Sequence, residues 1–201
     1  MQDKSERWSQ SLSSLCGNMT LVSDERSRLT SALLYTSNEH FFSIVKLCSK
    51  NIPTSAFALL RPQYEAYTRG IWVQYCATDP QVESILNGKN FPRGNADILR
   101  DLDGVEGIDG NALNNLNEVV WKKGCDYTHG GGIQASWHIG RSSIGSQYNR
   151  KEINGLCQVS CSISLSNSID LAKLCNSPNT VVKLANKYKK VFKIYMPVPT
   201  D

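Results

Sequence analysis

Three charged side chains lie at four-residue steps in one of the most apolar segments of the chain. They are Arg61, Glu65 and Arg69, within the stretch ALLRPQYEAYTRGIW at 58–72. Residues four apart on an α-helix project from the same face, so the three charges would form one row. Glu65 can pair with both arginines, which leaves one positive charge in excess. The row is therefore a candidate site for an anion.

A histidine supplies the second candidate group. His129 directly precedes the three glycines at 130–132. Imidazole titrates near neutral pH, and beside an arginine it is suited to act as a general base with an anion-orienting partner. Glycine also lets a ligand come close to the backbone. A structural interpretation stays open, because a histidine that ends a helix can interact with the last carbonyl groups.

The charged row belongs to a predicted helix at 55–77 that is apolar on nearly every side. A helix of this kind is a central one, and Pro62 is expected to kink it beside Arg61. Buried charges need partners. The row is thus either an internal salt-bridge network or a functional site. Candidate partners elsewhere in the chain are Glu39, His40, Asp126 and His129.

Apolar periodicity near 3.6 residues accounts for most of the remaining chain, and no segment alternates as a strand does. The 201 residues therefore predict a single all-α domain, 1–201, built as a bundle of about five to seven helices. Irregular loops are expected around 88–110 and 130–150, where Gly, Asp, Asn and Ser are frequent. The predicted helices are 4–16, 24–50, 55–77, 79–88, 111–127, 151–175 and 179–194.

The predicted helix 24–50 carries one stripe at three- and four-residue steps. His40 lies on that stripe and is interpreted either as a satisfied core histidine or as a group that contacts substrate. The stripe, which predicts the buried face, consists of Leu29, Leu33, Thr36, His40, Ile44 and Leu47.

Composition narrows the class of protein. The seven cysteines form no CxxC pair, which favours free thiols in a reducing cytoplasm. The N-terminal residues MQDKSERWSQ do not resemble a signal peptide, and no apolar run reaches the roughly 20 residues of a membrane span. P-loop, Rossmann and HExxH motifs are missing. We therefore expect a cytoplasmic protein with no metal, no cofactor and no membrane contact.

The predicted last helix, 179–194, has a basic face. A solvated surface is one interpretation, and an RNA-contacting surface with Tyr188 and Tyr195 near the lysines is the other. The lysines are Lys183, Lys187, Lys189, Lys190 and Lys193.

Three sequence segments together carry a family resemblance: NEHFFSIV, LRPQYEAYTRGIWVQYCA and DYTHGG. They lie within 38–77 and 121–134, roughly a quarter of the chain. This combination resembles a group of bacterial helical proteins of unknown function. That group in turn resembles the HEPN superfamily, named for higher-eukaryote and prokaryote nucleotide-binding domains.

The resemblance implies an HEPN-like fold and a function. Active HEPN members are metal-independent RNases of toxin or phage-defence type that use an arginine and a later histidine of one helix at a dimer interface. It implies that His129 is the base on a ribose 2′-OH, and that RNA, a second copy of the chain and an antitoxin or defence partner are the partners, with no DNA. We predict a catalytic set of His129, Arg61, Arg69 and Glu65, and substrate contacts at His40, Lys123, Tyr127 and Gln134.

The chain departs from that pattern just before the histidine. The preceding positions hold Lys122, Lys123 and Gly124 instead of an arginine. Either Lys123 replaces the arginine, or Arg61 or Arg69 reaches the same place from another helix, or the chain is not a nuclease. Lysine lacks the bidentate fork of arginine. The alternative function is a non-catalytic interaction or small-anion-binding module in which the charged cluster is structural.

Overall fold

Ten helices and no β-strand make up the part of the chain that the computed structural model describes, residues 1–17, 19 and 24–194. An isolated bridge pairs Ile139 with Ile144. The predicted all-α class is therefore confirmed. The helices are α1 (Gln2–Cys16), α2 (Glu25–Ser49), α3 (Pro53–Ala58), α4 (Leu60–Tyr75), α5 (Asp79–Leu86), α6 (Asn95–Leu102), α7 (Gly110–Thr128), α8 (Gly132–Ser136), α9 (Arg150–Leu174) and α10 (Pro178–Phe192).

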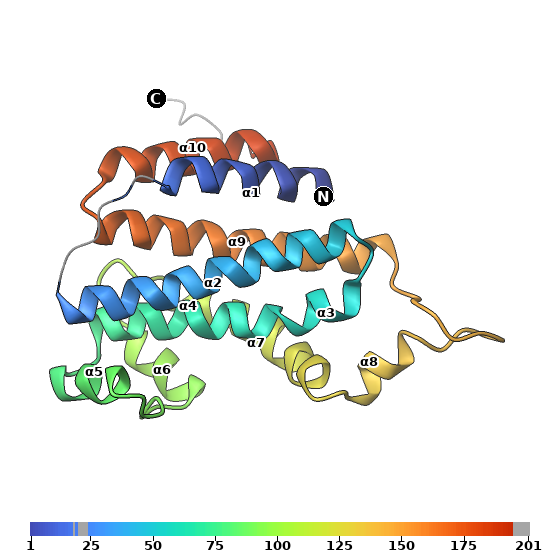
Figure 1. The fold of residues 1–201 in the computed structure, drawn as a ribbon, viewed down its shortest axis with the longest axis horizontal. Helices are drawn as coiled ribbons and strands as arrows, with labels where there is room; N and C mark the ends of the chain where they lie inside the picture. The colour runs from blue at the N-terminus through green and yellow to red at the C-terminus, as the bar shows by residue number, and fades with distance from the viewer. Residues whose placement is uncertain (18, 20–23, 195–201) are drawn as a thin grey trace.

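The helices form successive layers (Figure 1). Helices α1 and α10 lie side by side on one outer face and pack on α9. The long helices α2 and α9 come next, and α4 packs on the other side of α2. The core has two parts: one surrounds Tyr64 and Trp72 of α4, and the other surrounds Trp8 of α1 and Leu184 of α10.

Helix α4 is central, as its apolar composition predicts. It contacts α2, α6, α7 and α9, and Tyr64, Trp72 and Val73 are at most 1% exposed. The position predicted for its distortion is wrong. The chain breaks at Leu59, between α3 and α4, instead of bending beside Arg61. Pro62 explains the break, because its ring lacks an N–H and crowds the carbonyl four residues earlier, at the end of α3.

The buried face of α2 is rotated away from the predicted stripe. Of that stripe, only Ile44 is buried, whereas His40 is half-buried and Thr36 is exposed. Small polar side chains occupy the buried face, and one of them, Ser37 Oγ, donates to the Gln63 carbonyl at 2.9 Å. A prediction from the spacing of apolar residues does not identify buried polar residues such as this one. The buried polar residues of α2 are Ser27, Thr30, Ser31, Ser37 and Asn38.

Two helices occur where loops are expected. Within 88–110, α6 buries Ile98, Leu99 and Leu102. Its Asp101 carboxylate accepts a 2.9 Å hydrogen bond from Trp72 Nε1. Within 130–150, α8 forms one short turn, and the segment after it extends away from the bundle (Figure 1). Both helices are short and flanked by glycine, so composition alone assigns them to loops.

All seven cysteines are free thiols, of which Cys48, Cys157 and Cys161 are buried. Burial raises the pKa of Cys161 to about 12, so this thiol stays protonated and packs as an apolar group. Among the helices that the structure describes, none has the length and apolarity needed to cross a membrane.

Candidate functional site

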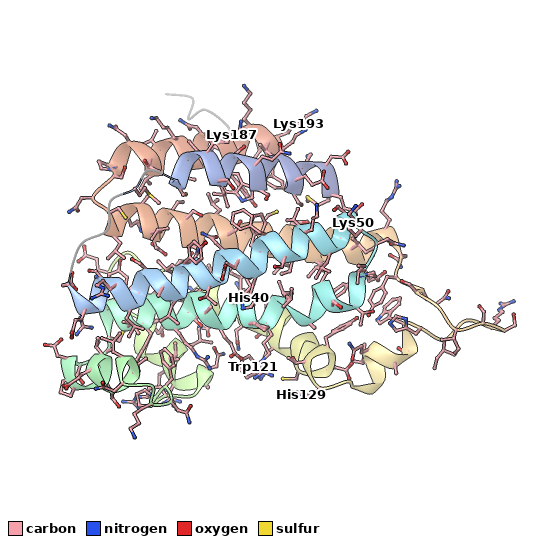
Figure 2. The ribbon with its side chains drawn as sticks, viewed as in Figure 1. His40, Lys50, Trp121, His129, Lys187 and Lys193 are labelled. Carbon is pink, nitrogen blue, oxygen red and sulfur yellow. The ribbon has the colours of Figure 1, made fainter. Side chains whose placement is uncertain are left out.

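An open pocket of about 330 Å³ lies between α2, α4 and the end of α7. It brings the charged row of α4 together with two histidines that are far apart in the sequence. Figure 2 shows His40 on α2 and His129 where α7 ends. The polar residues that line the pocket are Thr36, His40, Arg61, Glu65, Arg69, Thr128 and His129.

The three charges of α4 are paired along the helix. Glu65 binds Arg61 through Nε at 2.7 Å and Arg69 through Nη2 at 3.3 Å. Their side chains are 17%, 20% and 38% exposed, in the order Glu65, Arg61, Arg69. The row therefore lies on the wall of an open pocket and not in a dry core. One carboxylate against two guanidinium groups leaves the wall with one excess positive charge.

Helix α7 holds Arg61 in a defined position. The guanidinium carbon lies 4.0 Å from the centre of the Trp121 ring, a cation–π arrangement. Arg61 Nη1 also lies 3.0 Å from Cys125 Sγ. Gly124 permits this approach, because a Cβ at that position would lie only 2.8 Å from Arg61 Cβ. The Arg61 side chain is thus clamped between two helices.

Arg69 is held more loosely, at the other end of the row. Its guanidinium carbon lies 5.1 Å from the centre of the Phe91 ring. With more than a third of its side chain exposed, Arg69 can reorient toward an anion in the pocket at little cost. The row therefore presents one fixed and one adjustable guanidinium group.

His129 is exposed at the C-terminal end of α7, where its backbone N–H donates to the Cys125 carbonyl at 3.2 Å. The glycines after it form a tight turn. Gly130 has a φ of +68°, which favours glycine. The Asp126 carboxylate occupies the space that a side chain at Gly131 would need, and it accepts a 2.6 Å bond from the Gln134 N–H. This turn therefore fixes the backbone position of His129.

His40 lies half-buried on the α2 side of the pocket. Burial lowers the pKa of His40, and the Glu39 carboxylate opposes that shift. The ring is therefore neutral at neutral pH, with one nitrogen free to accept a hydrogen bond. Within the described residues, no group of three or more His, Cys, Asp or Glu side chains is arranged to hold a metal ion.

Two of the predicted substrate contacts do not line the pocket. Tyr127 is buried and stacks on Phe57, with the ring centres 4.8 Å apart. Burial raises the pKa of Tyr127, and the neighbouring Tyr148 raises it further. Gln134 lies on α8 and bonds to Asp126 through its backbone. The side chain of Lys123 lies outside the described residues.

Sequence reasoning missed three residues of the site. Thr36 lies one turn before His40 on the same face of α2, and Thr128 directly precedes His129. The helical spacing could have revealed Thr36. Trp121, which supports Arg61, is two turns before His129 on α7, and no feature of the sequence indicates that contact.

Comparison with known proteins places the chain in a family. No curated protein and no solved structure matches it. The family of unknown function DUF6988 matches residues 34–197. That range covers most of the chain and contains His40, His129 and the whole charged row, whereas α1 lies outside it. The protein therefore belongs to the DUF6988 family, a family of unknown function.

Proposed function

We propose that the pocket binds a phosphodiester of RNA and that the protein is a metal-independent endoribonuclease. One observation carries the proposal: two imidazole groups and two guanidinium groups line one open pocket. Guanidinium groups bind phosphate oxygens, and imidazole transfers protons near neutral pH. The HEPN resemblance of the sequence points to the same chemistry and stays a prediction.

The reaction assigns each group a role. His129 takes the proton of a ribose 2′-OH, the freed oxygen attacks the adjacent phosphorus, and the 5′-oxygen of the next nucleotide leaves with a proton from solvent. A 2′,3′-cyclic phosphate results. Arg61 and Arg69 hold the non-bridging oxygens, where negative charge builds up. Glu65 keeps both guanidinium groups in place, and the neutral His40 ring accepts a hydrogen bond from the substrate.

The proposed partners follow from this activity. RNA is the substrate, and the implied biological setting is a toxin or phage-defence protein with an antitoxin or defence partner. In that setting the protein is proposed to act as a homodimer. Light scattering of the purified protein measures the mass and hence tests the dimer.

A second function is favoured by the pairing within the row. Both arginines already bind Glu65, and Arg61 is also held by Trp121 and Cys125. Such an arrangement suits a structural network with one free positive charge, which would hold a small anion without a reaction. In this case inorganic phosphate raises the melting temperature, while RNA stays intact.

Cleavage of total RNA in the presence of EDTA tests the nuclease proposal. We expect the wild type to cut and His129→Ala to lose the activity. His138→Ala is the matched control, because His138 bonds to Thr54 at 2.7 Å and does not line the pocket. A wild type without activity, or equal cleavage by wild type and His129→Ala, would overturn the proposal.

A further inference from the structure

A second concave surface lies in the outer layer of the bundle. A groove of about 880 Å³ runs between α1 and α10. Helices α2 and α9 separate that layer from α4 and its pocket (Figure 1). Figure 2 shows Lys187 and Lys193 in this layer, away from His40 and His129. The groove is therefore a different site from the pocket.

Positive charge is concentrated in this groove. Six cations line it, and among the residues that the structure describes no Asp or Glu does. The whole chain carries a formal charge of only +4, so the remainder is net negative. In the described part of the chain, none of the six forms an ion pair. The cations are Lys4 and Arg7 of α1, Lys183, Lys187 and Lys190 of α10, and Lys193 just after it.

Each helix aligns its cations along the groove. On α10, Lys183, Lys187 and Lys190 are four and three residues apart and so share one face. On α1, Lys4 and Arg7 are followed on the same face by Ser11 and Ser14, which also line the groove. Two parallel rows of donors thus border one channel.

The two helices are held together beneath these rows. Trp8 is fully buried, donates a 2.7 Å hydrogen bond to Ser164 Oγ, and packs edge to face on Tyr188 with the ring centres 5.0 Å apart. Lys4 Nζ donates to the Phe192 carbonyl at 3.3 Å. The cations therefore stand on a fixed support. Tyr188, expected from the sequence to lie beside the lysines, is buried and cannot stack on a base; Tyr195 lies outside the described residues.

We propose that this groove binds the phosphodiester backbone of a single-stranded nucleic acid without reading its bases. Two rows of lysine and arginine along a channel complement a line of phosphates. The strand would lie on the outer surface of the groove, between the two rows of cations, because the two helices are packed together beneath it. Among the described residues no aromatic side chain lines the groove, so the proposal assigns no base stacking to it. The inference does not rest on cleavage in the pocket.

Fluorescence anisotropy with a labelled oligothymidylate tests this binding on the wild-type chain. The probe has no 2′-OH, so the proposed cleavage chemistry cannot consume it. Lys187→Gln combined with Lys190→Gln should weaken binding roughly 10- to 30-fold at about 0.1 M salt, because the variant loses two phosphate contacts. Each such contact contributes about −0.7 to the slope of log K against log salt for a single strand. The slope of log K against log salt should also become shallower by about 1.4.

The matched control removes the same charge elsewhere. Lys46→Gln combined with Lys50→Gln changes two exposed lysines at the end of α2, where Figure 2 labels Lys50. This pair should leave the affinity nearly unchanged. Equal weakening by both pairs would overturn the proposal, because net charge alone would then explain binding. Tighter binding of polyglutamate or of anionic vesicles than of oligothymidylate would also overturn it, since a protein or a membrane would then be the better partner.

The two proposals fail separately. Loss of oligothymidylate binding with RNA cleavage intact would reject the groove and leave the pocket. Oligothymidylate binding without any RNA cleavage would reject the proposed nuclease activity of the pocket and leave the groove. A labelled oligouridylate bound to His129→Ala then shows whether the groove prefers RNA to DNA.

Discussion

The Arg61 guanidinium carbon lies 4.0 Å from the centre of the Trp121 ring, which joins α4 to α7 at the edge of the pocket. A partly buried contact of this kind contributes about 0.5–2 kcal/mol. It holds Arg61 while Glu65 binds the same side chain from within α4. One arginine therefore connects the fold and the candidate site.

A double-mutant cycle measures this contact. We expect Arg61→Met and Trp121→Leu to show a coupling of about 0.5–2 kcal/mol in the free energy of unfolding, because each change alone removes the same interaction. Urea denaturation provides the values. Arg69→Met is the control, since Arg69 lies on Phe91, and its effect should add to that of Trp121→Leu. Strict additivity in both cycles would contradict the prediction.

Gly124→Ala should destabilise the protein by about 1–3 kcal/mol, although alanine is the better helix former. The new Cβ would lie 2.8 Å from Arg61 Cβ and would push α7 away from α4. Gly155→Ala on α9 is the matched control, because nothing lies within 4 Å of a Cβ there. That variant should gain about 0.5–1 kcal/mol. If denaturant midpoints rise for both variants, α7 does not pack as closely as described.

Glu65→Gln separates the structural and the binding role of the row. Without the carboxylate, two arginines face each other unneutralised, and unfolding should require about 1–2 kcal/mol less free energy. The same change leaves the pocket more positive, so inorganic phosphate should raise the melting temperature of the variant more than that of the wild type. A thermal-shift titration checks both effects. Identical phosphate responses would show that phosphate does not bind at the row.

The pH dependence of stability tests the burial of His40. Its pKa in the folded state lies below the ordinary value of 6.5, so the folded chain binds this proton less tightly than the unfolded chain does. Stability linked to His40 is therefore complete above pH 6.5 and is lost as the pH falls below it. The melting temperature of the wild type should therefore fall more steeply with decreasing pH than the melting temperature of His40→Gln. Parallel declines would mean that His40 is as solvated in the folded protein as in the unfolded chain.

The sequence predicts the helices well where apolar residues recur at helical spacing. The charged row can be predicted because residues four apart on a helix must lie on the same face. Five of the eight predicted site residues line one pocket. Tyr127 does not line this pocket, because a residue two positions before His129 on a helix points to a different side, here toward Phe57. The meeting of His40 with His129 depends on how α2 and α7 pack on α4, which local spacing does not contain.

Helix α2 shows a different limit. Its buried face carries serine, threonine and asparagine, whose small side chains let neighbouring helices approach closely. Of these, Ser37 and Thr30 bond to α4. Gly70 of α4 lies against that face, where a Cβ would be 3.0 Å from Leu34 Cδ2. Apolar residues usually mark the buried face of a helix, and the buried polar residues of α2 reverse that pattern. The predicted stripe of α2 therefore lines the pocket, with Thr36 and His40.

The burial of Trp8 in the core has a practical consequence. Trp8 and Leu12 of α1 are at most 2% exposed, and they cover Phe41, Leu184 and Tyr188. A chain shortened to the range of the family match would lose α1 and leave those apolar side chains open to water, a surface that promotes aggregation. Experiments on the features shared by the family should therefore keep the first helix, even though it lies outside the shared sequence.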